Sequence, residues 1–219
     1  MIRQISVSGY VEKVSPGKII CVGRNYRKHI EEMKSVEAEE PVFFLKPPSS
    51  LICEGEDIVI PPQSRYVHHE VELAAVIGKS GKNIPAEDAL GFIMGYAILL
   101  DITARDLQDI AKKTSSPWAV SKGFDTFAPV SAITQTVLVG DPQDLTIQLW
   151  VNDELRQSSN TSYMLHTVAA LVSKASQIFT LEPGDIIATG TPEGVGQLVA
   201  GDQVRASISH LGTVKFAVR

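Results

Sequence analysis

The residues most able to do chemistry lie in segment 68–72, HHEVE. In a β-strand, side chains two positions apart share a face and lie about 6.5–7 Å apart, so Glu70 and Glu72 point the same way. Ala74 and Val76 continue that face and indicate that it is buried. Two buried carboxylates repel each other and lose hydration, which favours a cation between them. The alternative is that this end of the strand is exposed and both carboxylates are solvated.

A third carboxylate, Asp101, follows the apolar run 92–100, which predicts a buried strand. Three carboxylates without a well-placed cysteine favour a hard cation with oxygen ligands, Mg²⁺ or Mn²⁺. Zinc is the alternative, because His68 has the same strand parity as Glu70 and Glu72. The sequence alone does not bring Glu72 and Asp101 together in space.

His29 and Glu32 are three residues apart in a helix predicted over about 26–33. That spacing lets the carboxylate orient the imidazole and raise its basicity, as a general base requires. An ordinary surface pair is the alternative. Cys21 is close in sequence, but its apolar strand predicts a buried thiol rather than a nucleophile. We expect segment 24–40 to be mobile and to close over a site when a ligand binds.

A second predicted helix runs from Thr103, its expected N-cap, to about residue 112. Arg105 and Gln108 share one face of this helix. Because the helix directly follows Asp101, its first turn points toward whatever Asp101 binds. The alternative is a solvated face on which Arg105 pairs with Asp109.

Segment 189–196, TGTPEGVG, is a glycine-rich turn after a predicted strand. It is not a phosphate-binding loop, because Gln197 stands where lysine would follow, and it is not a dinucleotide fingerprint, because no helix follows. Its N–H groups and threonine hydroxyls suit an anion such as a carboxylate, with a plain turn as the alternative. The chain has no Gly-x-Ser-x-Gly motif, which argues against a serine hydrolase.

Short strands and a few helices must position these residues. Apolar runs bounded by Gly or Pro predict strands over 19–22, 42–45, 57–60, 70–78, 92–100, 145–151 and 154–158, with three more in the tail. Asn152-Asp153 predicts a hairpin turn. Further helical segments are expected over 85–90 and 163–178. Since no linker or repeat divides the chain, we expect a single catalytic domain over 1–219, of the α+β class and mostly β.

Composition excludes several classes of protein. Lys and Arg total 20 and Asp and Glu total 25, a net charge of −5, whereas nucleic-acid binding needs a basic stripe. The longest apolar run, 89–100, is shorter than the roughly 17–25 residues of a membrane helix. Residues 1–13 lack the apolar core of a signal peptide. The distant Cys21 and Cys53 indicate a reducing compartment. We therefore expect a cytoplasmic protein without nucleic-acid or membrane partners.

Together these motifs resemble those of the fumarylacetoacetate hydrolase family, in its short acylpyruvase-like form. The matching stretches span residues 22–196 and are, in family order, VGRNYRKHIEEM, FFLKP, HHEVELAAVIG, GYAILLDITARDLQ, SKGFDTFAPV and ATGTPEGVG. The resemblance implies the mixed β-roll or sandwich fold of the family's C-terminal domain, a bound Mg²⁺ or Mn²⁺, and a homodimer. Larger relatives carry an N-terminal domain, which has no counterpart in the short segment 1–17.

The resemblance also implies roles for individual residues. The metal ligands would be Glu70, Glu72 and Asp101, in agreement with the strand-parity argument. The catalytic residues would be the dyad of His29 and Glu32, together with Lys122. The substrate-binding positions would be Arg24, Lys46, Arg105, Gln108 and Thr191.

The activity implied first is Mg²⁺-dependent hydrolysis of the C–C bond of acylpyruvates, which are 2,4-dioxo acids, to pyruvate and a carboxylic acid. His29 would activate water, while Lys122 and Gln108 would stabilise the oxyanion. The alternatives are oxaloacetate decarboxylation, oxaloacetate keto–enol tautomerisation and isomerisation of a hydroxydienoate, since all pass through an enolate at the same metal. A non-catalytic binder of a metal and a 2-oxo acid is a further alternative. Because the carboxylates repel one another, we expect Glu70→Gln to leave the metal-free stability unchanged or higher.

Overall fold

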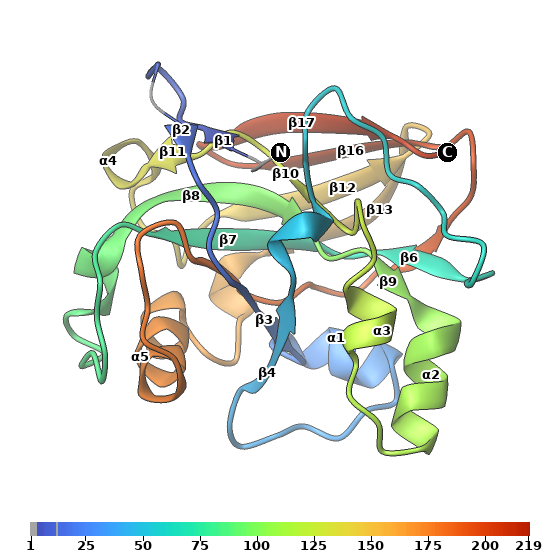
Figure 1. The fold of residues 1–219 in the computed structure, drawn as a ribbon, viewed down its shortest axis with the longest axis horizontal. Coiled ribbons are helices and arrows are strands. Elements are labelled where there is room, and N and C mark those ends of the chain that lie inside the picture. The colour runs from blue at the N-terminus through green and yellow to red at the C-terminus, as the bar shows by residue number, and fades with distance from the viewer. Residues whose placement is uncertain (1–3, 12) are drawn as a thin grey trace.

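A large mixed sheet carries the residues of interest, and its strands come from distant parts of the chain (Figure 1). This computed structural model describes residues 4–11 and 13–219. Residues 1–3 and 12, which belong to the expected N-terminal segment 1–17, lie outside the described residues. The strand order is β4 (Val42–Lys46), β3 (Ile19–Gly23), β14 (Ile186–Ala188), β7 (Val71–Ile77), β8 (Ile93–Leu100), β10 (Ala128–Val130) and β5 (Leu51–Cys53), and β11 (Thr134–Gln135) pairs with β8.

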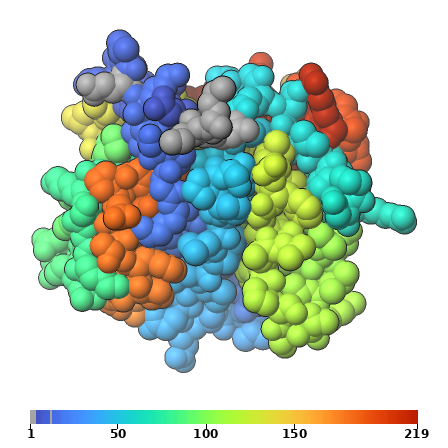
Figure 2. Space-filling view, viewed as in Figure 1, coloured from blue at the N-terminus to red at the C-terminus, as the bar shows by residue number. Residues whose placement is uncertain are grey.

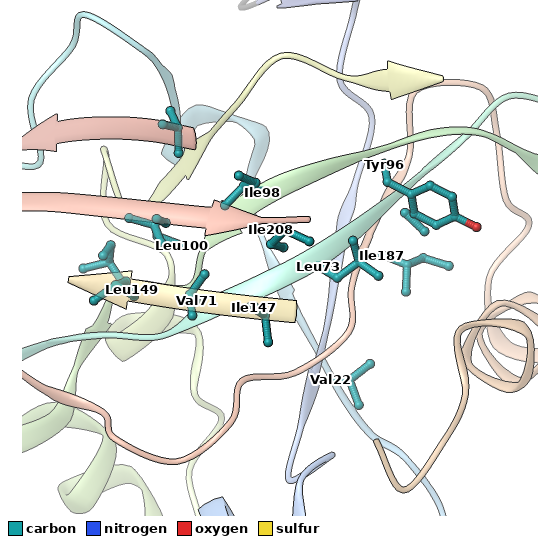
Figure 3. Packing of buried hydrophobic residues seen from close by; sticks show 14 of the residues in the cluster. Val22, Val71, Leu73, Tyr96, Ile98, Leu100, Ile147, Leu149, Ile187 and Ile208 are labelled. Carbon is teal, nitrogen blue, oxygen red and sulfur yellow. The ribbon is translucent and has the colours of Figure 1, made fainter. Parts of the chain in front are cut away.

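Central strands β7 and β8 are apolar on both faces because other layers cover both sides of the sheet. On one face, Leu73 and Ile98 pack near Ile147 of a second, antiparallel sheet (Figure 3). The hairpin predicted at Asn152-Asp153 joins two strands of this second sheet and is confirmed. The strand order is β13 (Glu154–Asn160), β12 (Thr146–Val151), β16 (Gln203–Ile208) and β17 (Gly212–Ala217).

The opposite face of the large sheet holds a second apolar cluster. Ala74 of β7 and Leu99 of β8 lie in this cluster, together with Ile19 and Cys21 of β3. Because side chains alternate along a strand, residues two positions beyond these apolar ones point to the same side of the sheet. The acidic residues at the ends of β7 and β8 therefore continue this face.

Short elements complete the fold. β15 (Gly196–Leu198), β6 (Val67–His69) and β9 (Thr103–Ala104) form a three-stranded sheet, and β1 (Ile5–Ser6) pairs with β2 (Lys13–Val14). The helices are α1 (Arg27–Glu32), α2 (Arg105–Lys113), α3 (Ala119–Lys122), α4 (Thr136–Val139) and α5 (Val168–Ile178), with 3₁₀ turns η1 (Pro48–Ser50), η2 (Ala89–Phe92) and η3 (Thr161–Tyr163). No helix in residues 4–11 and 13–219 is long and apolar enough to cross a bilayer. Of the residues that the structure describes, 38% are in strands or bridges and 20% are helical, so the predicted class is confirmed.

Two short elements differ from their predictions. The strand expected over 57–60 is wrong, because only Ile58 makes an isolated bridge, to Val218. The two prolines that follow this segment have no N–H with which to extend a ladder. The helical turns expected over 85–90 lie later, in the 3₁₀ turn Ala89–Phe92.

Two helices begin later than predicted. The helix expected over 163–178 starts at Val168, because the backbone just before it is extended and is hydrogen-bonded to Asn25. Thr103 lies in β9, and α2 starts at Arg105 without a side-chain cap. Thr103 is therefore not the N-cap of that helix.

Candidate active site

The register of β7 and β8 brings the three predicted carboxylates together. Glu72 pairs with Leu99, and the Asp101 N–H donates to the Glu70 carbonyl at 2.8 Å, so Glu70 and Asp101 face each other across the two strands. One oxygen from each of the three carboxylates lies within 4.8 Å of the others, and all three side chains are buried. A long-range strand pairing thus supplies the contact that the sequence alone leaves open.

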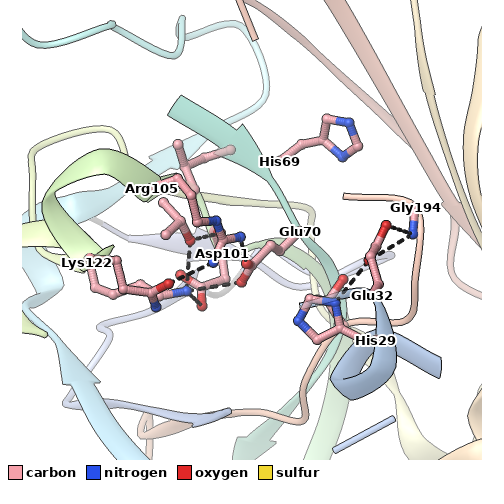
Figure 4. A network of polar contacts seen from close by, with 12 residues as sticks. His29, Glu32, His69, Glu70, Asp101, Arg105, Lys122 and Gly194 are labelled. Carbon is pink, nitrogen blue, oxygen red and sulfur yellow. Dashed lines mark hydrogen bonds and ion pairs between the residues drawn. The ribbon is translucent and has the colours of Figure 1, made fainter. Parts of the chain in front are cut away.

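Cations on three different elements pair with two of these carboxylates. Figure 4 shows two of these cations, Lys122 and Arg105. At the end of α3, Lys122 Nζ donates to Glu70 Oε2 at 2.9 Å, to Asp101 Oδ2 at 2.5 Å and to the Thr103 hydroxyl at 2.7 Å. Arg105, at the start of α2, pairs with the Glu70 carboxylate. Arg105 therefore does not make the alternative pair with the carboxylate four residues later.

Lys46 lies behind the acidic cluster. Its Nζ donates to Asp101 Oδ1 at 2.5 Å and to the Ile102 carbonyl at 2.9 Å, and the side chain is fully buried. Lys46 is absent from the residues that line the pocket in front of the carboxylates. Lys46 therefore lies outside the pocket wall, where a substrate-binding residue was expected. Its contacts suit a residue that fixes the orientation of Asp101.

Glu72 differs from its two neighbours because no cation pairs with it in the described part of the chain. Its carboxylate accepts one hydrogen bond, from the Gly190 N–H at 2.9 Å. Burial, followed by the charges of Asp101 and Glu70, raises the pKa of Glu72 well above its usual range. Burial also acts to raise the pKa of Glu70, but Lys122 and Arg105 outweigh it and hold that pKa well below its usual range.

This donor set fits a divalent cation. A buried acid without a counter-ion is unstable in its charged form, and a cation between the three carboxylates would supply the missing charge. All three donors are carboxylate oxygens, which suit Mg²⁺ or Mn²⁺ better than a softer metal. The zinc alternative gains no support, because His68 is outside the cluster and packs edge-on against the Tyr66 ring. Cys21 is buried, and burial raises the pKa of its thiol, so it is no nucleophile.

The predicted dyad stands beside the acidic cluster (Figure 4). His29 Nδ1 lies 3.3 Å from Glu32 Oε2, and the Gly194 N–H donates to both Glu32 oxygens at 3.1 and 3.2 Å. Burial acts to raise the pKa of Glu32, but its hydrogen bonds with His29 and Gly194 outweigh this and lower the pKa. An ionised carboxylate only accepts, so in the neutral imidazole the proton is on Nδ1 and the lone pair is on Nε2, where it can take a substrate proton.

The turn at 189–196 links the dyad to the acidic cluster. Its Gly190 N–H binds Glu72, and its Gly194 N–H binds Glu32. The Thr191 hydroxyl lines the pocket, donates to the Val71 carbonyl at 2.8 Å and accepts from Gln157 at 2.9 Å. Through these hydrogen bonds the turn connects helix α1 to strand β7.

Two residues of this network were not predicted as site residues from the sequence. Gln157 of β13 is fully buried, accepts from the Val71 N–H at 3.1 Å and donates to Thr191. Thr103 accepts from Lys122. Neither residue carries a local signal, because Gln157 lies in a polar strand and Thr103 has the pattern of a helix cap.

A cavity of about 40 Å³ lies in front of the carboxylates. A water needs roughly 10–15 Å³ on this measure, so the cavity suits a small ligand. The structure brings to its wall the three carboxylates and six of the other predicted residues, which are Arg24, His29, Arg105, Gln108, Lys122 and Thr191. A small pocket that combines a cation site, positive charge and a base can bind and enolise a short carboxylate-bearing ketone.

The sequence matches a known protein family over most of its length. The family model described as fumarylacetoacetate (FAA) hydrolase C-terminal matches residues 18–219. The chain belongs to the fumarylacetoacetate hydrolase family. It is 53% identical over 218 residues to an uncharacterized protein of Pyrococcus abyssi, covering 100% of this chain and 96% of that protein.

Other members of the fumarylacetoacetate hydrolase family have named activities. The mitochondrial oxaloacetate tautomerase FAHD1 of Arabidopsis thaliana is 47% identical over 201 residues, covering 92% of this chain and 90% of that protein. The crystal structure of fumarylpyruvate hydrolase from Pseudomonas aeruginosa, in complex with Mn²⁺ and pyruvate, has a TM-score of 0.95 at 37% identity. It covers 99% of this chain and 95% of its own. The fold expected from the motifs is confirmed, and members of the family are enzymes.

Proposed function

We propose that this protein is a divalent-metal-dependent enzyme that interconverts the keto and enol forms of a small 2-oxo acid, with oxaloacetate as the substrate. The observation that carries the proposal is the buried triad of Glu70, Glu72 and Asp101 beside the lone pair of His29 Nε2. The 47% identity to an oxaloacetate tautomerase supports this choice among the reactions of the family.

The residues of this chain would share the work as follows. Glu70, Glu72 and Asp101 would hold the cation, which supplies Lewis acidity to the C2 oxygen when it is bound. His29 Nε2 removes a proton from C3 while Glu32 holds the ring and stabilises its positive charge. Lys122 and Arg105 stabilise negative charge on the C2 oxygen. The imidazolium then gives the same proton to that oxygen, so the step balances without another reactant.

Hydrolysis of acylpyruvates, which the sequence suggests first, is the second candidate. The similarity to fumarylpyruvate hydrolase supports it. In that reaction His29 would deprotonate a water molecule instead of C3, and the product is pyruvate with a carboxylic acid. Oxaloacetate decarboxylation and hydroxydienoate isomerisation would use the same residues.

A homodimer and a cytoplasmic location also stay predictions. Analytical ultracentrifugation would test whether the protein is a dimer.

A side-by-side assay tests the proposal. Conversion of enol-oxaloacetate and pyruvate release from acetylpyruvate are followed with Mg²⁺ or Mn²⁺, and metal-only blanks are subtracted. We expect His29→Asn to reduce kcat on oxaloacetate by about 10²–10⁴-fold. The control is His210→Asn, since His210 is exposed and outside the pocket. A wild-type rate on oxaloacetate no greater than the blank would overturn the proposal. Pyruvate release from acetylpyruvate alone would establish the hydrolase instead.

A further inference from the structure

The outer end of the pocket is built differently from its inner end. Arg24, directly after β3, and Lys112, near the end of α2, line it together with Trp118. The same three residues line an open groove that leads outward between residues 33–36 and the segment after α2. A ligand seated on the acidic cluster would therefore extend past Arg24 and Lys112 toward solvent.

The two ends also differ in how their charges are paired. At the inner end, Lys46, Arg105 and Lys122 each pair with a carboxylate of the cluster. At the outer end, neither Arg24 nor Lys112 has a carboxylate within 4.0 Å among residues 4–11 and 13–219. Glu32 and Asp109 line the adjoining groove, but neither lies within ion-pair distance of Arg24 or Lys112. Both cations at the outer end are therefore free of a direct ion pair with these carboxylates.

The surroundings of Lys112 disfavour its positive charge. Its side chain is half-buried, and its Nζ lies 6.0 Å from the centroid of the Trp118 ring. Burial, and then the positive charges of Arg105 and Arg24, act to lower the pKa of Lys112, and together they outweigh the negative charges of Asp109 and Glu70, so that this pKa lies below its usual value. An anion placed between these cations would remove the repulsion and replace lost hydration.

Arg24 is held in an unusual backbone conformation. Its φ is +64°, in the left-handed region that disfavours residues with a Cβ by roughly 1–2 kcal/mol. Its guanidinium donates to the Val36 carbonyl at 3.2 Å, which keeps the side chain on the groove side of the pocket. A glycine would adopt this turn without strain. The strained arginine therefore points to a use for its side chain at this place.

We propose that Arg24 and Lys112 form a subsite for a second carboxylate, so that the pocket selects 2-oxo dicarboxylic acids over 2-oxo acids with a neutral far end. This inference rests on the proposed function, because the 2-oxo end must lie at the acidic cluster. Lys112 then determines specificity without touching the reacting atoms. The two carboxylates of the substrate would bind to two sets of cations at opposite ends of the pocket.

The test compares oxaloacetate with its 4-monoethyl ester, which keeps the reacting C1–C3 unit but has a neutral far end. The variants are Lys112→Met, which keeps the stem and loses the charge, and Lys113→Met, a control at the exposed neighbour. We expect Lys112→Met to raise KM for oxaloacetate about tenfold, equivalent to roughly 1.4 kcal/mol, with kcat within twofold. Its KM for the ester, and both KM values of Lys113→Met, should stay within twofold of wild type.

The outcomes separate the subsite from the proposed function. An equal loss on acid and ester in Lys112→Met, or no loss on either, would overturn the subsite while the reaction stands. If the wild type turns over neither compound, the proposed function fails, and calorimetry on the Mn²⁺-loaded protein decides the subsite. There, oxaloacetate binding tighter than the ester by about tenfold, and only in proteins that keep Lys112, supports it. Equal affinities overturn it.

Discussion

At the scale of single residues, the three carboxylates of the cluster have different surroundings. Glu70 and Asp101 are each held by two cations, whereas Glu72 has one backbone N–H. The sequence-based expectation treats the three as equal, so that removal of any one relieves repulsion. The structure changes this expectation for Glu70, because its removal leaves Arg105 buried without a carboxylate partner.

We therefore predict opposite effects of two conservative substitutions on the metal-free protein at pH 7. Glu72→Gln should raise the melting temperature by about 2–4 °C, since it removes a buried acid whose ionised form is disfavoured by burial and by two neighbouring carboxylates, a cost of roughly 1 kcal/mol. Glu70→Gln should lower the free energy of unfolding by about 3–5 kcal/mol, as breaking a buried ion pair does. Thermal and urea unfolding in the presence of a chelator measure both. A lower stability of Glu72→Gln would show that this carboxylate is a structural partner.

At the scale of elements, the 189–196 turn holds the site together. Gly194 has φ +93°, and a Cβ there would lie 2.0 Å from the Arg156 carbonyl oxygen. Gly201 has a similar φ of +98° with nothing within 4 Å of its Cβ position, so it isolates the effect of φ alone.

We predict that Gly201→Ala costs about 1 kcal/mol of stability and leaves kcat unchanged. Gly194→Ala should cost clearly more, because the turn must move away from β13, and it should also lower kcat through the loss of the N–H bond to Glu32. Urea unfolding and the oxaloacetate assay measure the two effects. Equal behaviour of the two variants would mean that the turn does not position the dyad.

Helix α1 makes contacts that the prediction of a mobile segment over 24–40 did not include. The sequence predicts a mobile segment over 24–40, whereas in the structure α1 is attached to the turn through Glu32 and through an ion pair of Lys28 with Glu193 at 3.5 Å. The stretch after the helix is more open, and Val36 is 78% exposed. We therefore expect ligand-dependent ordering to be concentrated after the helix.

The attachment of α1 should depend on pH. The pKa of Glu32 is lower in the folded protein than in the unfolded chain. Its stabilising contribution is thus fully present above the unfolded value of about 4.5 and is lost as pH falls through the lower folded value. Hydrogen exchange should show α1 more protected in wild type than in Glu32→Gln above that range, with the difference vanishing in acid. A difference independent of pH would contradict this origin.

At the scale of the whole molecule, local patterns predicted much of the fold but not its long-range pairings. Strand parity placed Glu70 and Glu72 on one buried face, and the Asn152-Asp153 turn marked its hairpin, because both signals are local. The spatial partners of these residues could not be predicted from local patterns. Glu70 and Asp101 lie opposite each other only because strands from distant segments pair. Family motifs supplied Lys122, whose three bonds no local pattern reveals.

The arrangement of the site also predicts that a bound metal ion both stabilises the folded protein and enables its activity. The large sheet, helices α1, α2 and α3 and the turn all contribute residues to one small cavity. Among its three carboxylates, Glu72 is the one that pairs with no cation in the described part of the chain. A cation at 100 times its Kd would stabilise the folded state by about 2.7 kcal/mol. Activity and stability should therefore rise together with metal concentration.

The most direct test measures the rate of oxaloacetate keto–enol conversion as Mn²⁺ is added back to chelator-treated protein. We predict a blank-subtracted rate of zero without metal, a saturable recovery in wild type, and no recovery in Glu72→Gln at the same Mn²⁺ concentrations. A full rate in the chelator-treated wild type, or wild-type recovery in Glu72→Gln, would contradict the claim that this acidic cluster is the metal centre of the enzyme.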